Sequence, residues 1–185
     1  IPFSHQRHVS GNGIDCRYCH TTVETSNFAG IPPTETCMTC HSQILTDQPM
    51  LAPILESWQT GKSMEWTRLN DLPDFVYFNH SIHISKGIGC NHCHSNGVAK
   101  IEEMRLTVKA QSFRMTWCLD CHKDPAQFIR PKEEVFNMSW KPGSRDAKST
   151  LEKMGFDNQH ELGEHLIKDY NVEVEQMTNC SICHR

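Results

Sequence analysis

The sequence predicts a mainly irregular chain with short α-helices and few strands, organised around bound groups instead of its own apolar side chains. Only 37% of the 185 residues are hydrophobic and 8% are aromatic, which is little for a conventional core. All 10 cysteines fall into five copies of one pentapeptide pattern, which leaves about 37 residues per copy. So short a chain can wrap large groups but can bury few side chains of its own.

The repeated pattern is Cys-x-x-Cys-His, and we number its copies one to five in chain order. It is the attachment signal for a c-type haem, because two thiols bond to the porphyrin and the adjacent imidazole reaches the iron. The thioether cysteines are Cys16, Cys19, Cys37, Cys40, Cys90, Cys93, Cys118, Cys121, Cys180 and Cys183, and the proximal ligands are His20, His41, His94, His122 and His184.

Zinc and disulfides are the alternatives for so many cysteines. The spacing from Cys16 to Cys40 also suits a zinc ribbon, and an oxidising compartment would permit a disulfide framework. Neither explains a histidine after every pair, in a chain with 12 histidines. We therefore predict five covalently bound haem c groups, which form the core of a multihaem cytochrome c fold and lie close together.

An internal repeat supplies candidates for the second axial ligand. A Phe-x-His-x-x-His stretch precedes motif one as Phe3–His8 and motif three as Phe78–His83, at nearly equal distance. Histidines three residues apart on a helical turn can each reach a different haem. Surface exposure is the ordinary alternative for histidine, but the duplication favours iron ligation. The predicted distal ligands are His5, His8, His80 and His83.

For the fifth iron we prefer Met115, which lies three residues before Cys118. Thioether ligation would raise the potential of that haem above those of bis-histidine haems. A gap-filling role for Met115 and ligation by His165, His160 or Met177 remain alternatives.

Four segments organise the chain. Residues 1–41 are predicted to form a first dihaem module, and residues 42–77 a linker with a short amphipathic helix. Residues 78–122 form the second dihaem module, and residues 123–185 hold a strap, C-terminal helices and the fifth haem site.

Residue periodicity predicts the regular elements within these segments. Helices are expected at Met50–Trp58, ending at Gly61, at Asp146–Met154, ending at Gly155, and at Gln159–Tyr170. Extended pieces are expected at Glu65–Leu69 and Phe75–Phe78, a strand at Met104–Val108, and an extended surface strap at Asp124–Gly143.

The charge balance excludes a nucleic-acid partner, because the formal net charge is -4 before haem propionates are added. No apolar run of about 18 residues is present, so the chain as given is not expected to cross a membrane. Residues preceding Ile1 are expected to have been processed away or left out. Several basic residues are candidates for contact with haem propionates, and solvent exposure is the alternative for each of them. They are Arg7, Arg17, His92, Lys123, Arg130 and Arg185.

The supply of ligands matches the number of irons, and every motif carries histidine. We therefore predict electron relay with no catalytic site of its own. The competing functions are a free soluble multihaem shuttle, an oxyanion reductase with one open iron, and a zinc-binding interaction protein.

Longer strings than the haem motif carry a family resemblance. The stretches Phe3–Val9, Gly13–His20, Ala29–Gln43, Asp71–His83 and Trp117–His122 resemble the pentahaem cytochrome c subunit of bacterial alternative complex III. Each half also resembles the class III multihaem cytochromes in its Phe-x-His-x-x-His stretch.

The resemblance implies a subunit of a membrane quinol oxidoreductase on the periplasmic face of the bacterial cytoplasmic membrane. Its implied partners are an iron-sulfur subunit, a monohaem cytochrome and quinol-binding membrane subunits. Electrons would leave towards a periplasmic cytochrome or a terminal oxidase. The family member also carries an N-terminal membrane helix, which this sequence does not include.

Overall fold

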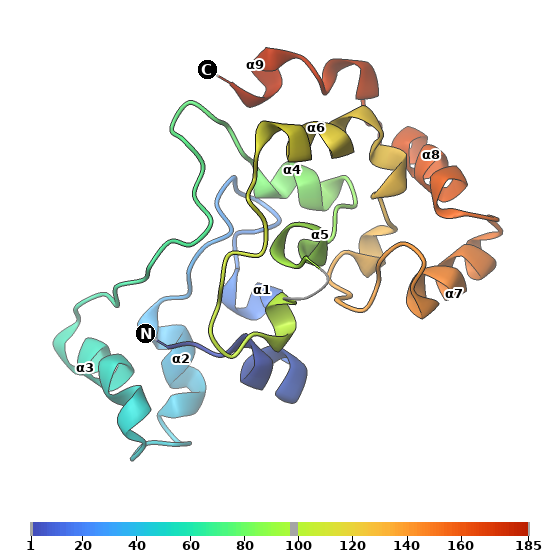
Figure 1. The fold of residues 1–185 in the computed structure, drawn as a ribbon. Coiled ribbons are helices and arrows are strands. Elements are labelled where there is room, and N and C mark those ends of the chain that lie inside the picture. Colours follow the sequence, from blue (N-terminus) through green and yellow to red (C-terminus); the bar gives the residue numbers. More distant parts are fainter. Residues whose placement is uncertain (1, 97–99, 185) are drawn as a thin grey trace.

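The computed structural model describes residues 2–96 and 100–184, and it folds this chain into short helices joined by irregular segments (Figure 1). The α-helices are α1 (Cys16–Cys19), α2 (Thr34–His41), α3 (Ala52–Thr60), α4 (His80–Ser85), α5 (Cys90–His94), α6 (Met115–Lys123), α7 (Arg145–Met154), α8 (Gln159–Asp169) and α9 (Cys180–Cys183). A π-helical segment, η1 (Gln6–Gly11), and the 3₁₀ turns η2 (Pro49–Leu51), η3 (Ile101–Glu103), η4 (Pro125–Gln127), η5 (Lys132–Glu134) and η6 (Val174–Gln176) complete the list.

The fold class predicted from the sequence is confirmed. Within the described residues there is no strand, and the one isolated bridge pairs Val76 with His184 in antiparallel fashion. The strand expected at Met104–Val108 is wrong. The Met104 main-chain oxygen accepts from the Gln6 N–H of η1 at 3.0 Å, which ties this segment to a helical turn instead of a neighbouring strand.

The three expected helices are present. The linker helix forms as η2 followed by α3, and Gly61 ends it in the left-handed conformation with φ 69°. Gly155 ends α7 in the same way with φ 77°, since only glycine adopts this conformation without steric cost. Side chains cap the first turns of α7 and α8, where Ser144 accepts from the N–H of Ala147 and Asn158 accepts from the N–H of Glu161.

The surface position predicted for Asp124–Gly143 is wrong. Trp140 has 0% of its surface exposed, and Val135, Ile129 and Ala126 are also buried. Two 3₁₀ turns, η4 and η5, fold the segment inward, and its apolar side chains then leave water.

The protein's own apolar core is divided into two clusters. One contains Ile88, Ile129, Leu162 and Leu166, and it joins α8 to the segment that precedes motif three. The other packs α2 on α3 through Met38, Leu51 and Ile54.

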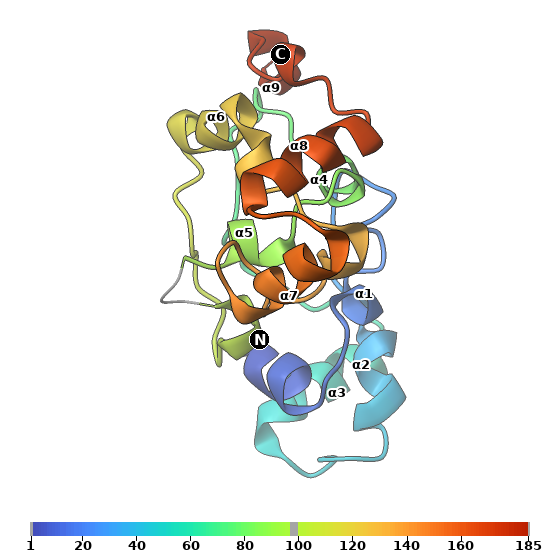
Figure 2. The same ribbon diagram turned by 90° about the vertical axis from the view of Figure 1, so that its right-hand side faces the viewer.

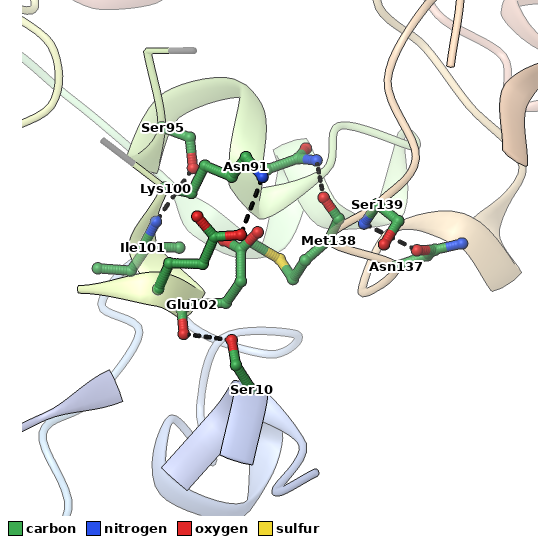
Figure 3. A network of polar contacts seen from close by, with 10 residues as sticks. Ser10, Asn91, Ser95, Lys100, Ile101, Glu102, Asn137, Met138 and Ser139 are labelled. Carbon is green, nitrogen blue, oxygen red and sulfur yellow. Dashed lines mark hydrogen bonds and ion pairs between the residues drawn. The ribbon is translucent and has the colours of Figure 1, made fainter. Parts of the chain in front are cut away.

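The helices that carry the cysteines follow one another along the long axis of the molecule. Figures 1 and 2, which are at right angles, both show them in the order α2, α1, α5, α6, α9. Polar contacts hold the connecting segments, such as the Ser10 hydroxyl that donates to the main-chain oxygen of Glu102 at 2.6 Å and ties η1 to η3 (Figure 3). Among the described residues no helix is long and apolar enough to span a membrane.

Candidate haem-binding sites

Every Cys-x-x-Cys pair is helical. In motifs one, three and five the helix begins at the first cysteine, whereas α2 and α6 begin three residues before theirs. Residues three apart on a helix lie on one side, so the two sulfurs of each motif project from the same face. The histidine of each motif lies in the last turn or at the C-cap of the same helix, next to that face.

Three proximal imidazoles are oriented by main-chain carbonyl groups. A carbonyl only accepts, so the Nδ1 atoms of His20, His41 and His122 carry the proton and their Nε2 atoms keep a lone pair for a metal. The acceptors are the oxygens of Gly30 at 2.7 Å, Ile44 at 3.3 Å and Met177 at 2.9 Å, respectively.

His94 has a side-chain partner instead. Its Nδ1 lies 3.5 Å from the Nδ2 of Asn70, and the buried Oδ1 of Asn70 has no partner among the described residues. Rotating the Asn70 amide by half a turn places Oδ1 against the Nδ1–H and satisfies both atoms. The Nε2 of His94 is then also free for a metal.

The first Phe-x-His-x-x-His stretch is built around Phe3. Its ring meets His5 edge-on at 4.9 Å between centroids and stacks on His8 at 4.5 Å. The His8 Nδ1 donates to the Ser4 oxygen at 2.8 Å, and the His5 Nδ1 lies 3.0 Å from the Thr107 hydroxyl. The two rings are therefore fixed at different angles with Nε2 unengaged.

The second stretch repeats this geometry around Phe78. Its ring meets His80 edge-on at 4.7 Å and stacks on His83 at 4.6 Å. The His83 Nδ1 donates to the Asn79 oxygen at 2.7 Å, and the His80 Nδ1 donates to the Asn27 oxygen at 2.9 Å. The sequence repeat is thus also a structural repeat, with one aromatic ring orienting two imidazoles.

Distal and proximal imidazoles face one another at the separation that a haem iron requires. A bond from a metal to an imidazole nitrogen is about 2 Å, so two rings on opposite sides of one iron have centroids roughly 6 Å apart. Three pairs meet this requirement: His8 with His41 at 6.2 Å, His80 with His94 at 6.5 Å, and His83 with His122 at 6.2 Å.

His5 lies close enough to His20 for the two imidazoles to interact electrostatically. Burial, with smaller contributions from the nearby His20 and His8, lowers the pKa of His5 to about 4. Burial also lowers the pKa of His94 to about 4 and reduces those of His80 and His83. These imidazoles are therefore neutral near pH 7, which is the form that binds a metal.

Contacts between cysteines place motif one between motifs two and three. A hydrogen bond joins the side chains of Cys16 and Cys90, and with burial it raises the pKa of Cys90. Burial raises the pKa of Cys19, and the nearby thiol of Cys37 adds to the effect. Motifs one and three are therefore in contact, and motif two lies on the other side of motif one.

Motifs four and five extend this order. Burial raises the pKa of Cys93 to about 12, with further contributions from Cys121 and Cys118 of motif four. Burial also raises the pKa of Cys118, to which Cys183 of motif five contributes. The spatial order of the motifs is therefore two, one, three, four, five, which agrees with the order of their helices in Figures 1 and 2.

The fifth motif has a less complete set of partners. His184 stacks on Phe75 at 5.9 Å, and the Cys183 oxygen accepts from the Tyr77 N–H at 2.8 Å. Met115 begins α6, has 62% of its surface exposed, and lies one turn before Cys118, the cysteine of α6 that is near motif five.

The other candidates for the fifth iron lie elsewhere. His160 and His165 are exposed on α8, where His160 lies 3.4 Å from Asp124 and His165 packs beside Phe156. Met177 supplies its main-chain oxygen to His122, on the proximal side of motif four.

His92, for which solvent or propionate contact is expected, packs against two aromatic rings. Its ring stacks on Trp117 at 5.5 Å and tilts against Phe128 at 4.7 Å.

The basic residues near the motifs have different environments. Arg17 pairs with Asp15 at 2.8 Å and lies over the Phe136 ring, while Arg7 and Lys123 are exposed. Arg130 is buried, so solvent exposure, the alternative to propionate contact, does not apply to it. Arg185 lies outside the described residues.

Sequence reasoning missed the residues that orient the imidazoles. Thr107 and Asn27 reach His5 and His80 from 102 and 53 residues away, and Gly30 and Ile44 act through main-chain oxygens that any residue provides. No sequence signal marks such partners.

The side chains fit a haem better than a bare metal ion. Among the described residues no group of three or more His, Cys, Asp and Glu side chains is arranged to hold a metal ion. Haem iron needs only two axial ligands from the protein, and opposed imidazole pairs with adjacent paired thiols supply both the ligands and the anchors.

Two comparisons with known proteins found cytochromes similar to this chain. Residues 76–185 match the family model described as cytochrome c7 and related cytochrome c. The chain is also 39% identical over 95 residues to the multiheme cytochrome c subunit of a menaquinone reductase from Nitratidesulfovibrio vulgaris. That alignment covers 51% of this chain and 44% of the relative, which is less than half of its length.

Proposed function

Because this chain belongs to the cytochrome c7 and related cytochrome c family, we propose that it relays electrons through five covalently bound haems within a membrane quinone oxidoreductase. The observation that carries the proposal is the set of opposed imidazoles 6.2 to 6.5 Å apart. Haem c supplies one-electron redox chemistry when it is bound. The protein's part is to fix the axial ligands, shield them from water and hold neighbouring sites close.

The proposed ligand set gives each iron one proximal and one distal side chain, in two repeated dihaem modules over residues 1–41 and 78–122. The matching geometry around Phe3 and Phe78 supports the repeat. The pairs are His20 with His5, His41 with His8, His94 with His80, His122 with His83, and His184 with Met115. The position of Met115 on the helix nearest motif five supports the last pair.

The spatial order of the motifs gives the proposed electron path. Motifs two and five are its ends, and each contains one of the two exposed cysteines, Cys40 and Cys180, whereas the other cysteines are half-buried. A porphyrin attached at an exposed cysteine presents its edge to a partner protein. Electrons would therefore enter at one end and leave at the other, with motif three at the centre.

Single-ligand variants test the ligand set. His8→Ala and His83→Ala should each convert one haem of five to high spin, because each removes one axial ligand. Electron paramagnetic resonance and resonance Raman spectra of the oxidised protein report the spin states. His160→Ala and His165→Ala are the matched controls and should leave every haem low spin. If every haem remains low spin in both His8→Ala and His83→Ala, the ligand assignment is contradicted.

Met115→Ala tests the pair at motif five. It should remove one methionine-ligated haem, which is the haem of highest potential, from a potentiometric titration. Met177→Ala is the control and should change no ligand, since Met177 acts through its main-chain oxygen. If Met177→Ala removes the high-potential haem and Met115→Ala does not, the assignment is reversed.

At a finer level, we propose that the complex is alternative complex III on the periplasmic face of the bacterial cytoplasmic membrane. The strings quoted from the sequence support this choice. Its partners would be an iron-sulfur subunit, a monohaem cytochrome and quinol-binding membrane subunits, with electrons passing to a periplasmic cytochrome or a terminal oxidase.

A second candidate complex works in the opposite direction. The relative from Nitratidesulfovibrio vulgaris is named as a subunit of a menaquinone reductase, and its 39% identity favours electron delivery to a quinone. The two directions differ in where the haem potentials lie relative to that of the quinone.

Rapid mixing of the purified complex distinguishes these directions. For alternative complex III, menaquinol should reduce the oxidised haems within the turnover time. For a quinone reductase, menaquinone should instead oxidise the prereduced haems, while menaquinol leaves oxidised haems unchanged. If the chain is purified from its native source without any membrane subunit, the result would favour the free soluble shuttle.

A further inference from the structure

Arg130 is a buried cation beside motif three. It has 2% of its surface exposed. Its Nη2 donates to the Oδ1 of Asn91 at 2.9 Å, and Asn91 lies between Cys90 and Cys93. The guanidinium carbon lies 4.4 Å from the centre of the Trp140 ring, which provides a cation–π contact.

No carboxylate forms an ion pair with this guanidinium within the described residues, although the nearby Glu134 carboxylate favours its charged form and opposes the lowering of its pKa by burial. The Nη1 atom makes two long bonds of 3.4 Å, to the main-chain oxygens of Glu134 and Asn137. The Glu134 carboxylate accepts from Asn137 at 2.7 Å and Thr150 at 3.4 Å instead. The buried Nε of Arg130 has no partner in the described part of the chain. A buried charge without an ion-pair partner is costly, so Arg130 is a candidate for a functional role.

Close packing fixes Arg130 against the haem-attachment segment. A Cβ atom built on Gly89 would overlap the guanidinium of Arg130, so glycine lets the two approach this closely. The Gly87 oxygen accepts from the Arg130 N–H at 2.9 Å. Asn91 is held in turn, since its Nδ2 donates at 2.9 Å to the main-chain oxygen of Met138 (Figure 3). The same Nδ2 donates to the main-chain oxygen of Trp140, also at 2.9 Å.

This position determines which part of a haem the charge would meet. Thioether bonds form at the vinyl edge of a porphyrin, and the propionates leave the opposite edge. A side chain bonded to Asn91 inside the Cys-x-x-Cys loop is therefore at the vinyl edge of the third haem, away from the propionates of that haem. The propionate contact expected for Arg130 from the sequence would therefore have to involve a haem other than the third.

We propose that Arg130 is a fixed positive charge that raises the reduction potential of the third haem, at the centre of the relay. The proposal rests on the proposed function, since it requires haem at motif three. An added electron is stabilised by a cation held nearby in a medium of low dielectric, where screening is weak. Arg130 acts as a positioning and tuning residue and does not ligate iron.

The charge persists under working conditions. Burial lowers the pKa of Arg130 to about 10, which still leaves the guanidinium protonated near pH 7. Once thioether bonds form, Cys90 and Cys93 no longer ionise, so neither sulfur supplies a compensating negative charge.

A titration of the full haem-loaded chain tests the proposal. Arg130→Met should lower the equilibrium constant for reduction of one haem at least tenfold. For one electron this lowers the midpoint potential by about 59 mV. The other haems should each change less than threefold. Arg130→Lys keeps the charge and should retain most of the wild-type potential. Arg68→Met, which removes a charge from an exposed side chain, is the matched control and should shift no haem.

The third haem can be identified in the His80→Ala background, where it should be the high-spin haem. Adding Arg130→Met should then shift the high-spin signal in the titration. Three results would each overturn the proposal. The haem potentials could be unchanged in Arg130→Met, they could shift equally in Arg130→Met and Arg130→Lys, or the shift could be confined to haems other than the third. If Arg130→Met does not fold, Arg130→Gln keeps a donor for Asn91, removes the charge, and carries the same expectation. Intact mass of the wild type counts the haems first, so failure of the proposed function is seen separately.

Discussion

The N-terminal segment 3–41 and the C-terminal segment 125–172 position their side chains by different means. Segment 125–172 buries Ile129, Trp140, Leu162 and Leu166 at 2% exposure or less. In segment 3–41 the buried hydrophobic residues are Val23 at 7% and Met38 at 9%. One end of the chain therefore has an apolar core of its own, and the other depends on what binds to it.

Helix length follows this difference. α7 and α8 contain 10 and 11 residues, and Ser144 and Asn158 cap their first turns with side-chain oxygens. α1 contains four residues, which is far below the length at which a helix is stable alone. Covalent attachment at two sulfurs and ligation at the adjacent histidine can hold such a turn where packing does not. Haem is thus expected to be the main structural element of the N-terminal segment.

Absence of haem should produce the largest difference in stability between the two segments. In the full chain produced without haem attachment, amides of α7 and α8 should stay protected by roughly 100-fold or more, since their core is apolar protein. Amides of residues 3–41 should exchange at nearly the unfolded rate. Hydrogen exchange with mass spectrometry measures both segments in one sample. Equal exchange in both would show that the C-terminal core also depends on haem.

Trp140→Ala should be the most damaging single substitution in the C-terminal segment. It creates a cavity at a fully buried site and removes the 3.1 Å bond from Nε1 to the Thr150 hydroxyl. Similar substitutions cost about 3–5 kcal/mol of unfolding free energy. Denaturant unfolding followed by circular dichroism measures the loss. Trp58→Ala, at 51% exposure on α3, is the control and should cost less than about 1 kcal/mol.

Gly155→Ala should cost about 1 kcal/mol, because alanine is strained in the left-handed conformation that ends α7. Gly61→Ala at the end of α3 meets the same local strain, and neither new Cβ has a neighbour within 4 Å. Comparing Gly155→Ala with Gly61→Ala in the haem-free chain shows which helix is still folded there. There Gly155→Ala should speed exchange in α7, while Gly61→Ala should change little if α3 is already open. A larger effect of Gly61→Ala would reverse the comparison.

Ser144→Ala should have the smallest effect, about 1 kcal/mol or less, because it removes the hydroxyl that accepts from the Ala147 N–H at 3.2 Å. Ser144→Thr keeps a hydroxyl and is the matched control. Thermal unfolding by circular dichroism should rank wild type, Ser144→Thr and Ser144→Ala in that order. A shift in haem potentials in Ser144→Ala would show that the two segments are more strongly coupled than the packing indicates.

Much of the candidate site could be predicted because its signals are local. The Phe-x-His-x-x-His stretches predicted paired imidazoles, and the structure opposes three of those imidazoles to proximal histidines at 6.2 to 6.5 Å. The helices that end at Gly61 and Gly155 were equally visible, since glycine marks a left-handed C-cap.

Errors occurred where distant segments decide the outcome. The alternation at Met104–Val108 gives no strand. The Gln6 N–H of η1 donates to the Met104 oxygen, and within the described residues no strand lies beside this segment. The prolines of Asp124–Gly143 suggested a surface strap, whereas contact with α7, α8 and motif three buries Trp140 and Arg130.

The sequence by itself determined the attachment points and the supply of axial ligands, because both are written in spacings of three or four residues that a helical turn converts directly into a shared face. Only the tertiary structure decided which imidazole opposes which, the order of motifs two, one, three, four and five, and the placement of Arg130 at motif three. Those relations join residues tens of positions apart. They depend on how the whole chain closes and packs, and no local pattern contains that information.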